Sequence, residues 1–318
     1  MRIVITGGTG YLGARLCRDL GSAGHEVIPV FRKLSASYAS WKALMFDTIE
    51  GDIRNQEIIQ QIADAGADVV IHLVSLDHRA SEADPATVSE TNVLPTWQLL
   101  DTCTKAGLKK FIFFSTIQVY GKLPIKILDE QTTIQTGNTY GLTHHLSEQL
   151  CDHYNRNTAT NIITVRLSNS YGEPVFDENN CWWLAINDLC RMAIEKKELR
   201  LLSDGTPQRD FIHGNDVVKG VETLLHATEK RSDNVYHISS GQTSTIMELA
   251  LKIRQVYQNR YQEEIPVYTP AGLFNPATFN PHSEKYTISN QKLTALGFEP
   301  SISLEAGINR IFDYLKRD

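Results

Sequence analysis

The stretch that decides the fold lies near the start of the chain and reads Thr6-Gly7-Gly8-Thr9-Gly10-Tyr11-Leu12-Gly13. The residues before it, Arg2 to Ile5, are typical of a buried strand, and a helical pattern follows it to about Ala23. Glycines at this spacing allow a tight turn and let a pyrophosphate approach the backbone where no Cβ intervenes. Free N–H groups and the dipole of the following helix would bind the phosphates. The stretch therefore predicts a dinucleotide site that includes Gly7, Gly10, Tyr11, Leu12 and Gly13.

Length and composition limit the classes of protein to consider. The 318 residues are enough for one large α/β domain and a smaller lobe. The net charge is −6 and there is no basic block, so nucleic acid is not an expected partner. No apolar run is as long as a membrane span, and the start is not typical of a secretory signal, so no membrane partner is expected. The five cysteines are never spaced C-x-x-C, which indicates reduced thiols, a cytoplasmic protein and no metal site.

Strand and helix patterns alternate after the glycine stretch. Strands are expected at 26–31, 42–47, 68–74, 110–114 and 161–167, with helices at 87–106 and 139–156. This alternation predicts a Rossmann-type α/β fold, a doubly wound parallel sheet with helices on both faces. Beyond Gly172 the elements are shorter and predict a smaller C-terminal substrate lobe. We expect a dinucleotide-binding domain over 1–172, to which 212–240 returns, and a substrate lobe over 173–211 and 241–318.

The end of the second strand bears on the choice of cofactor. In a dinucleotide fold an acidic residue there accepts from the ribose 2′-hydroxyl, whereas an arginine accommodates a 2′-phosphate. Here Arg32 and Lys33 follow the strand and no Asp or Glu is available. The pattern favours NADP, with NAD as the alternative, although two solvated loop cations would give the same pattern.

Thr116, Tyr140 and His144 form a candidate catalytic group. Tyr140 and His144 lie four residues apart on an expected helix, so their side chains share one face. Thr116 follows a buried strand, at the sheet edge where open α/β sheets bind ligands. A phenol, a hydroxyl and a nicotinamide suit the oxidation of an alcohol, in which the phenol takes the O–H proton. Because an unperturbed phenol titrates near ~10, it needs a nearby positive charge to act near neutral pH.

Over most of its length the chain resembles the extended short-chain dehydrogenase/reductases, in particular the nucleotide-sugar epimerases. The motifs that carry the resemblance are 6–13, Gly51-Asp52-Ile53, His72-Leu73-Val74, 115–121, Tyr140, 166–172 and 205–216. The resemblance implies that Asp52 and Ile53 contact the adenosine half of the cofactor and that Leu73 lies under it. It also implies a homodimer formed through the helices expected at 87–106 and 139–156.

The same resemblance implies roles for five site residues. Thr116 matches a catalytic Ser/Thr that also contacts the substrate, and Tyr140 matches the catalytic tyrosine, which lies against the cofactor. Asn169 and Arg209 match residues that bind a nucleotide diphosphate, and an arginine fork fits a pyrophosphate bidentately. His144 stands where the family has a lysine that binds the nicotinamide ribose and lowers the pKa of the tyrosine.

His144 leaves three functions open, because a histidine titrates near ~6.5 and is mostly neutral at pH 7. The first is a nucleotide-sugar epimerase that removes and returns one hydride. The second is an NADPH-dependent reductase of a keto-sugar or another carbonyl compound. The third is a cofactor-binding protein that has lost catalysis. A 4,6-dehydratase is disfavoured, because Ile117 and Gln118 follow Thr116 where that subgroup carries an acid.

Overall fold

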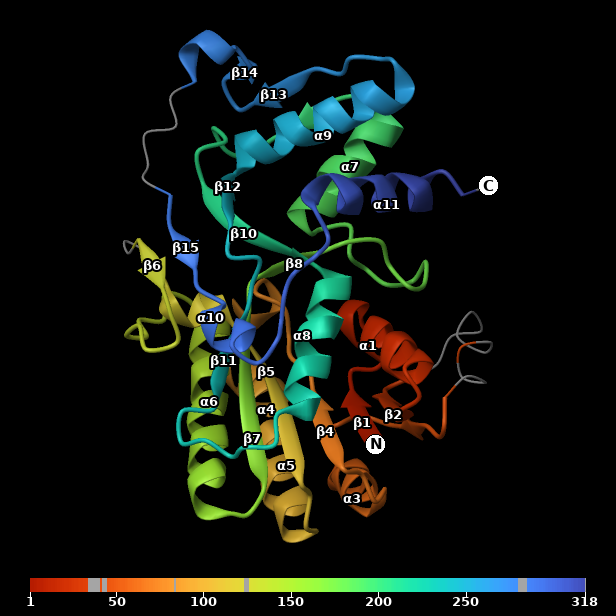
Figure 1. The fold of residues 1–318 in the computed structure, drawn as a ribbon, viewed down its shortest axis with the longest axis vertical. Coiled ribbons are helices and arrows are strands. Elements are labelled where there is room, and N and C mark those ends of the chain that lie inside the picture. Colours follow the sequence, from red (N-terminus) through yellow and green to blue (C-terminus); the bar gives the residue numbers. More distant parts are fainter. Residues whose placement is uncertain (34–40, 42–44, 83, 123–125, 280–284, 318) are drawn as a thin grey trace.

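The computed structural model describes residues 1–33, 41, 45–82, 84–122, 126–279 and 285–317. Its central sheet has seven strands in the order β11-β7-β5-β4-β1-β2-β3, and every neighbouring pair is parallel. The strands are β1 (Arg2–Thr6), β2 (Glu26–Phe31), β3 (Ile49–Glu50), β4 (Val69–His72), β5 (Lys110–Thr116), β7 (Asn161–Leu167) and β11 (Val235–Ile238). From β1 the chain adds β2 and then β3 at one edge of the sheet. It then returns to β4 beside β1 and adds β5, β7 and β11 towards the other edge, as in a doubly wound Rossmann sheet (Figure 1). The predicted fold class is confirmed.

Helices cover both faces of this sheet. One face carries α1 (Tyr11–Ser22) and α8 (Gly214–His226), and the other carries α3 (Gln56–Asp64), α5 (Leu94–Lys105) and α6 (Thr139–Asn157). Side chains alternate along a strand, so Ile3 and Ile5 join the core under α1 and α8, whereas Val4 joins the core under α3 and α5. Burial on both faces explains the nearly continuous apolar runs of the strands.

A second core lies beyond the carboxyl ends of the strands, in the upper part of Figure 1. It is built mainly by α7 (Ala185–Lys196), α9 (Ile246–Tyr261) and α11 (Leu304–Leu315), beside β9 (Leu199–Arg200), β13 (Val267–Thr269) and β14 (Gly272–Leu273). Between the two cores, β8 (Asn169–Tyr171) and β12 (Thr243–Thr245) flank β10 (Gln208–His213). The remaining short elements are α4 (Pro85–Asn92), α10 (Gln291–Thr294), β6 (Ile127–Leu128), β15 (Thr287–Ile288) and the 3₁₀ turns η2 (Ala80–Glu82), η3 (Ile117–Tyr120) and η4 (Pro276–Thr278). The division into the two domains expected from sequence stays a prediction.

Two elements differ from the sequence-based expectation. The strand expected at 42–47 lies instead at Ile49–Glu50, and 42–44 fall outside the described residues. Asp47 accepts a hydrogen bond from the Thr48 backbone N–H at 2.7 Å, a local bond that competes with strand pairing. The helix expected over 87–106 is two helices, α4 and α5, which meet at Val93. The break follows from Pro95, which has no N–H to donate to the carbonyl four residues earlier.

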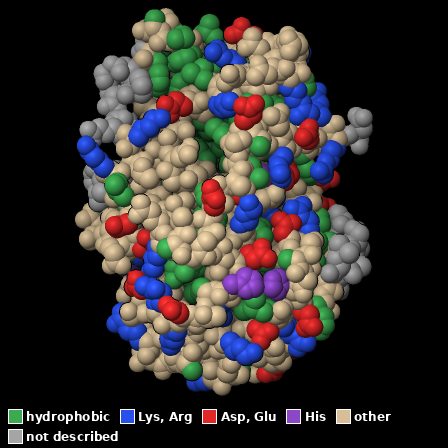
Figure 2. Space-filling model, viewed as in Figure 1, with side chains coloured by type: hydrophobic (Ala, Val, Ile, Leu, Met, Phe, Trp, Pro, Cys, Tyr) green, Lys and Arg blue, Asp and Glu red, His purple; other side chains and the backbone are tan. Residues whose placement is uncertain are grey.

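Acidic and basic side chains are interspersed over the face of the molecule drawn in Figure 2. Neither sign forms a continuous stripe on that face, in keeping with the modest net charge of −6. Among the described helices, none has the length and apolar character needed to cross a membrane.

Candidate cofactor and substrate site

The glycine stretch forms a tight turn between β1 and α1. Gly7 has a φ of +72°, in the left-handed region that favours glycine. A Cβ at Gly13 would lie 2.0 Å from the Gly7 carbonyl oxygen, and a Cβ at Gly8 would lie 2.5 Å from the Cβ of Pro29. The turn is therefore closed too tightly for side chains at these positions.

The first turn of α1 is open to an anion. Its N-cap is Gly10, which has no side chain to cap the helix, and the turn holds no acidic residue. By contrast, α4, α6 and α11 are capped by the side chains of Asp84, Asn138 and Ser303. The first N–H groups of a helix lack partners within it, so the uncapped start of α1 fits the pyrophosphate of a dinucleotide. The Tyr11 hydroxyl donates to the Gly172 carbonyl at 3.2 Å, which ties this turn to the segment that follows β8.

Arg32 and Asp52 lie beyond the carboxyl ends of β2 and β3, as expected for the adenosine end of a cofactor. Arg32 is exposed, and Ile53 is buried. Asp52 accepts from the Arg54 side chain at 2.7 and 3.0 Å and from its backbone N–H at 3.0 Å. Hydrogen bonding by Arg54, with a smaller contribution from Arg32, holds the pKa of Asp52 at about 2. The carboxylate is therefore ionised and oriented by Arg54, which the sequence analysis did not single out.

Leu73 lies against the glycine turn. Its N–H donates to the Thr6 hydroxyl at 3.2 Å, and a Cβ at Gly7 would lie 3.7 Å from the Leu73 Cβ. His72 is fully buried between the hydroxyls of Thr6 and Thr96, at 2.7 and 3.1 Å. Burial lowers the pKa of His72 to about 3, so this histidine is a neutral packed residue.

Thr116 and Tyr140 meet at the carboxyl edge of the sheet. Thr116 ends β5, and its hydroxyl oxygen accepts from the Gln118 backbone N–H at 3.2 Å. Tyr140 lies in the first turn of α6, and this turn packs against the residues that follow Thr116, because a Cβ at the next residue, Gly141, would lie 2.6 Å from the Gln118 carbonyl oxygen. The hydroxyls of Thr116 and Ser75 are near enough to the phenol to affect its pKa. Burial, with the Asp77 carboxylate nearby, raises the pKa of Tyr140 to about 12, although both hydroxyls act in the opposite direction. Ser75, which the sequence analysis did not single out, is a further hydroxyl near this phenol.

His144 lies beside Tyr140 without supplying a charge. The two ring centroids are 4.2 Å apart, but His144 Nδ1 donates to the Tyr140 carbonyl oxygen at 2.9 Å. The side chain is only 3% exposed, and burial lowers its pKa. The imidazole is therefore neutral near pH 7, and the phenol has no cation in the place of the lysine that the family resemblance implies.

Glu148 is the acid that could have charged His144, since it lies one turn further along α6. It is buried, and Arg166 donates to both of its oxygens, at 3.0 and 2.8 Å. The Ser115 hydroxyl donates to it at 2.5 Å. Arg166 already neutralises the Glu148 carboxylate. The attraction of this carboxylate for a proton on His144 is therefore too weak to overcome the effect of burial, which lowers the pKa of His144.

Asn169 and Arg209 lie on the neighbouring parallel strands β8 and β10, with Phe211 opposite Asn169. Asn169 Nδ2 donates to the Asp210 carbonyl at 2.8 Å. Arg209 is exposed, and one of its nitrogens donates to the Gln208 carbonyl at 2.7 Å. An exposed guanidinium beside a strand between the two cores suits the binding of a diphosphate.

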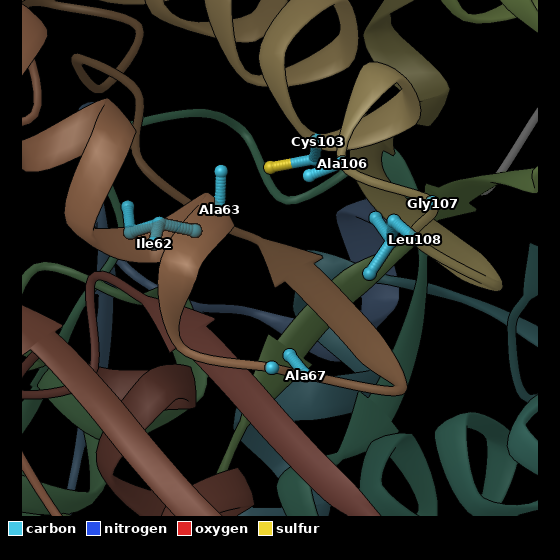
Figure 3. Close-up of a pocket in the computed structure, with 8 residues that line it drawn as sticks. Ile62, Ala63, Ala67, Cys103, Ala106, Gly107 and Leu108 are labelled. Carbon is cyan, nitrogen blue, oxygen red and sulfur yellow. The ribbon is translucent and has the colours of Figure 1, made fainter.

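A separate hollow lies between α3 and α5 (Figure 3). Apolar side chains and the Cys103 thiol line it, with Ile62 and Leu108 among them. It opens at the amino ends of β4 and β5, the edge of the sheet opposite to Thr116. It is therefore not part of the candidate site.

Comparison with known sequences identifies relatives over nearly the whole chain. The sequence model of the NAD dependent epimerase/dehydratase family matches residues 3–239. The dTDP-glucose 4,6-dehydratase of Streptomyces antibioticus is 27% identical over 327 residues, which cover 99% of this chain and 92% of the relative. A putative UDP-glucose 4-epimerase of Methanocaldococcus jannaschii is 26% identical over 320 residues, which cover 99% of each. Relatives thus include both dehydratases and epimerases.

Solved structures share the fold. The UDP-glucuronic acid 4-epimerase of Bacillus cereus, in complex with UDP-glucuronic acid and NAD, matches with a TM-score of 0.81 and 23% identity over 99% of both chains. The UDP-glucose 4-epimerase of Thermus thermophilus, in complex with NAD, matches with a TM-score of 0.81 and 21% identity over 99% of both. Both neighbours bind NAD, which gives no support to the NADP preference expected from Arg32. With a family model matched from residue 3 to residue 239, the chain belongs to the NAD dependent epimerase/dehydratase family.

Proposed function

We propose that this chain is an NAD(P)-dependent nucleotide-sugar epimerase that removes one hydride from a sugar carbon and returns it. The observation that carries the proposal is the placement of Thr116, at the end of β5, and of Tyr140, in the first turn of α6, at the edge of the sheet that also holds the glycine turn. The start of α6 packs directly on the residues after Thr116. Asn169 and Arg209 support a nucleotide diphosphate as the other half of the ligand. The substrates printed for the structural neighbours, UDP-glucuronic acid among them, support the same class.

Tyr140 and Thr116 have separate roles in the proposed reaction. A dinucleotide held by its pyrophosphate at the glycine turn would supply, in its nicotinamide, an acceptor for the hydride of a sugar C–H bond. Tyr140, as the phenolate, takes the proton of the sugar hydroxyl, and the Thr116 hydroxyl donates to the same sugar oxygen. The sugar loses two electrons and becomes a ketone. Tyr140 would return its proton to the sugar oxygen, and a hydride returned to the opposite face of the ketone would restore the alcohol with inverted configuration and no net oxidation.

The neutral His144 supports a second candidate, a cofactor-binding protein that has lost catalysis. With the pKa of Tyr140 at about 12, very little phenolate exists near pH 7. Each pH unit below a pKa lowers the ionised fraction about tenfold. We therefore expect the proposed epimerase to be slow at neutral pH. In the second candidate the same reaction does not occur at all.

The test is incubation of the purified chain with a panel of nucleotide sugars and either NAD or NADP, followed by separation of the products. An epimer that forms with no net change in the amount of reduced cofactor supports the proposal, provided that Tyr140→Phe abolishes it. Net consumption of NADPH identifies the reductase instead, which the exposed Arg32 favours. Bound cofactor with no product from any sugar rejects both enzymes and leaves the second candidate.

We also propose that the chain forms a homodimer through α5 and α6. Leu94 and Trp97 on α5 are 45% and 51% exposed, and Leu142 and Leu146 on α6 are 44% and 46% exposed. Each pair is three or four residues apart and shares one helix face. Large apolar side chains gathered on adjacent helices mark an interaction surface. A cytoplasmic location belongs to the same proposal, since all five cysteines are free.

A further inference from the structure

We propose that Asn179 is a positioning residue of the cofactor site, which holds the Thr9–Gly10 peptide so that the start of α1 keeps the shape that binds a pyrophosphate. This inference rests on the binding of a dinucleotide in the proposed function, but on no step of the reaction that follows.

Asn179 is a buried residue in a largely exposed loop. It belongs to the segment 172–184, which leads from β8 to α7 and passes the start of α1 (Figure 1). Asp177, Glu178 and Asn180 are exposed, whereas Asn179 is only 2% exposed. Burying an amide is costly unless its polar atoms are hydrogen-bonded, so this position requires partners for both ends of the side chain.

The two ends of the Asn179 amide have different partners. Its Oδ1 accepts from the Phe176 backbone N–H at 3.0 Å, and the Asn179 backbone N–H donates to the Phe176 carbonyl at 3.0 Å. These two bonds close a turn. The Nδ2 end of the amide donates to the Thr9 carbonyl at 2.8 Å. The loop thereby places one N–H donor on the glycine turn.

Both ends of the Thr9–Gly10 peptide are therefore held. Its carbonyl accepts from Asn179, and its N–H donates to the Gly7 carbonyl at 2.9 Å. The N–H groups that follow, from Tyr11 onward, have no acceptor within α1, and the peptide before them sets their direction. Gly10 has no Cβ and could turn that peptide in many ways. Asn179 restricts this freedom before the cofactor binds, which lowers the cost of binding.

The segment that carries Asn179 is anchored to both cores. The Gly172 carbonyl accepts from the Tyr11 hydroxyl at 3.2 Å and from Asn187 Nδ2 at 2.8 Å. Asn187 is fully buried on α7, and its Oδ1 accepts from the Gly172 N–H at 3.1 Å. The donor that reaches the glycine turn is therefore fixed by α7 of the second core as well as by α1.

The first test measures binding by calorimetry with three probes, which are adenosine, ADP and whichever of NAD and NADP the native chain binds more tightly. One neutral hydrogen bond corresponds to roughly a three- to tenfold change in an equilibrium constant. We expect Asn179→Ala to raise the Kd of the dinucleotide and of ADP by about that factor. The Kd of adenosine, which has no phosphate, should stay within about twofold. The matched control is Asn180→Ala, which removes an exposed amide and should change none of these constants.

Three results of this test would overturn the assignment. An unchanged Kd of the dinucleotide in Asn179→Ala would show that the turn keeps its shape without the amide. An equal rise for adenosine would show a general loosening of the cofactor site. A native chain that binds neither dinucleotide would reject the proposed function as well. A selective loss for ADP and the dinucleotide, in a chain that epimerises no sugar, supports the role of Asn179 and rejects the proposed function alone.

A second measurement follows the glycine turn without any ligand. We expect hydrogen–deuterium exchange in a peptide that covers 6–13 to be faster in Asn179→Ala than in the native chain or in Asn180→Ala, because the Thr9–Gly10 peptide is no longer held. Asn179→Asp separates the two bonds of the amide, since its carboxylate still accepts from the Phe176 N–H but has no proton for Thr9. Faster exchange in Asn179→Asp supports the assignment. Exchange at the native rate in Asn179→Asp overturns it.

Discussion

His144 Nδ1 donates to the carbonyl oxygen of Tyr140 at 2.9 Å, so the side chain in the lysine position is bonded to its own helix. With one proton on Nδ1 the imidazole is neutral, and burial disfavours the addition of a second proton at Nε2. Burial raises the pKa of the Tyr140 phenol, and His144 carries no charge that would offset it. The rate of the proposed epimerase depends on this relationship.

We predict that His144→Lys increases turnover at neutral pH. An ammonium group within a few ångströms lowers a phenol pKa by about one to three units, which raises the phenolate fraction near pH 7 by about 10- to 1000-fold. The matched control is His144→Gln, which keeps the site uncharged and should give no gain. Initial rates on the nucleotide sugar that the native chain epimerises provide the measurement. No gain with Lys, or an equal gain with Gln, contradicts the charge argument.

The native chain should show an alkaline pH profile. Tyr140 acts as a base only when it is ionised, and its pKa is raised to about 12, so the active fraction grows as pH rises towards that value. We expect log kcat to increase by about one for each pH unit between about pH 7 and 9. In His144→Lys the same curve should level off at a lower pH. A native profile that is flat over this range would show that Tyr140 is not the base.

The glycine turn, the parallel sheet covered on both faces and the place of Thr116 at the sheet edge follow from patterns that are local in sequence. Spaced glycines require close backbone approach, and a hydroxyl at the end of a buried strand must lie at the sheet edge. The groups that set the proton chemistry depend on tertiary packing instead. Whether Glu148 charges His144 depends on Arg166 from β7, which already neutralises that carboxylate. This relationship has no spacing that a single sequence reveals.

A buried ion pair joins the cofactor helix to the segment after β8. Arg15 of α1 is fully buried and lies 3.2 Å from Glu173, whose other oxygen contacts His213 at 3.2 Å. Burial disfavours the Glu173 carboxylate, but the His213 hydrogen bond and the Arg15 charge outweigh it and hold the pKa of Glu173 at about 2. We predict that Glu173→Gln lowers the free energy of unfolding at pH 7 by about 3 kcal/mol, because it leaves a buried guanidinium without its counter-ion.

The pH dependence of that loss has a defined sign. The folded pKa of Glu173, about 2, lies below its ordinary value of 4.5, so its stabilising contribution is present above about pH 4.5 and is lost as pH falls towards 2. The difference in urea midpoint between the native chain and Glu173→Gln should therefore shrink between about pH 5 and 3. A difference that stays constant over this range would rule out the ion pair as its source.

The exposed faces of α5 and α6 predict the oligomeric state. An aspartate at an interface would have to bury a charge, so Trp97→Asp and Leu146→Asp should each convert a dimer to a monomer in light scattering after size exclusion. The matched control is Leu202→Asp, since Leu202 is 92% exposed and lies beyond β9, away from α5 and α6. That variant should leave the native mass unchanged. A native chain that is monomeric at micromolar concentration, or a Trp97→Asp variant that remains dimeric, would show that these helices do not form the interface.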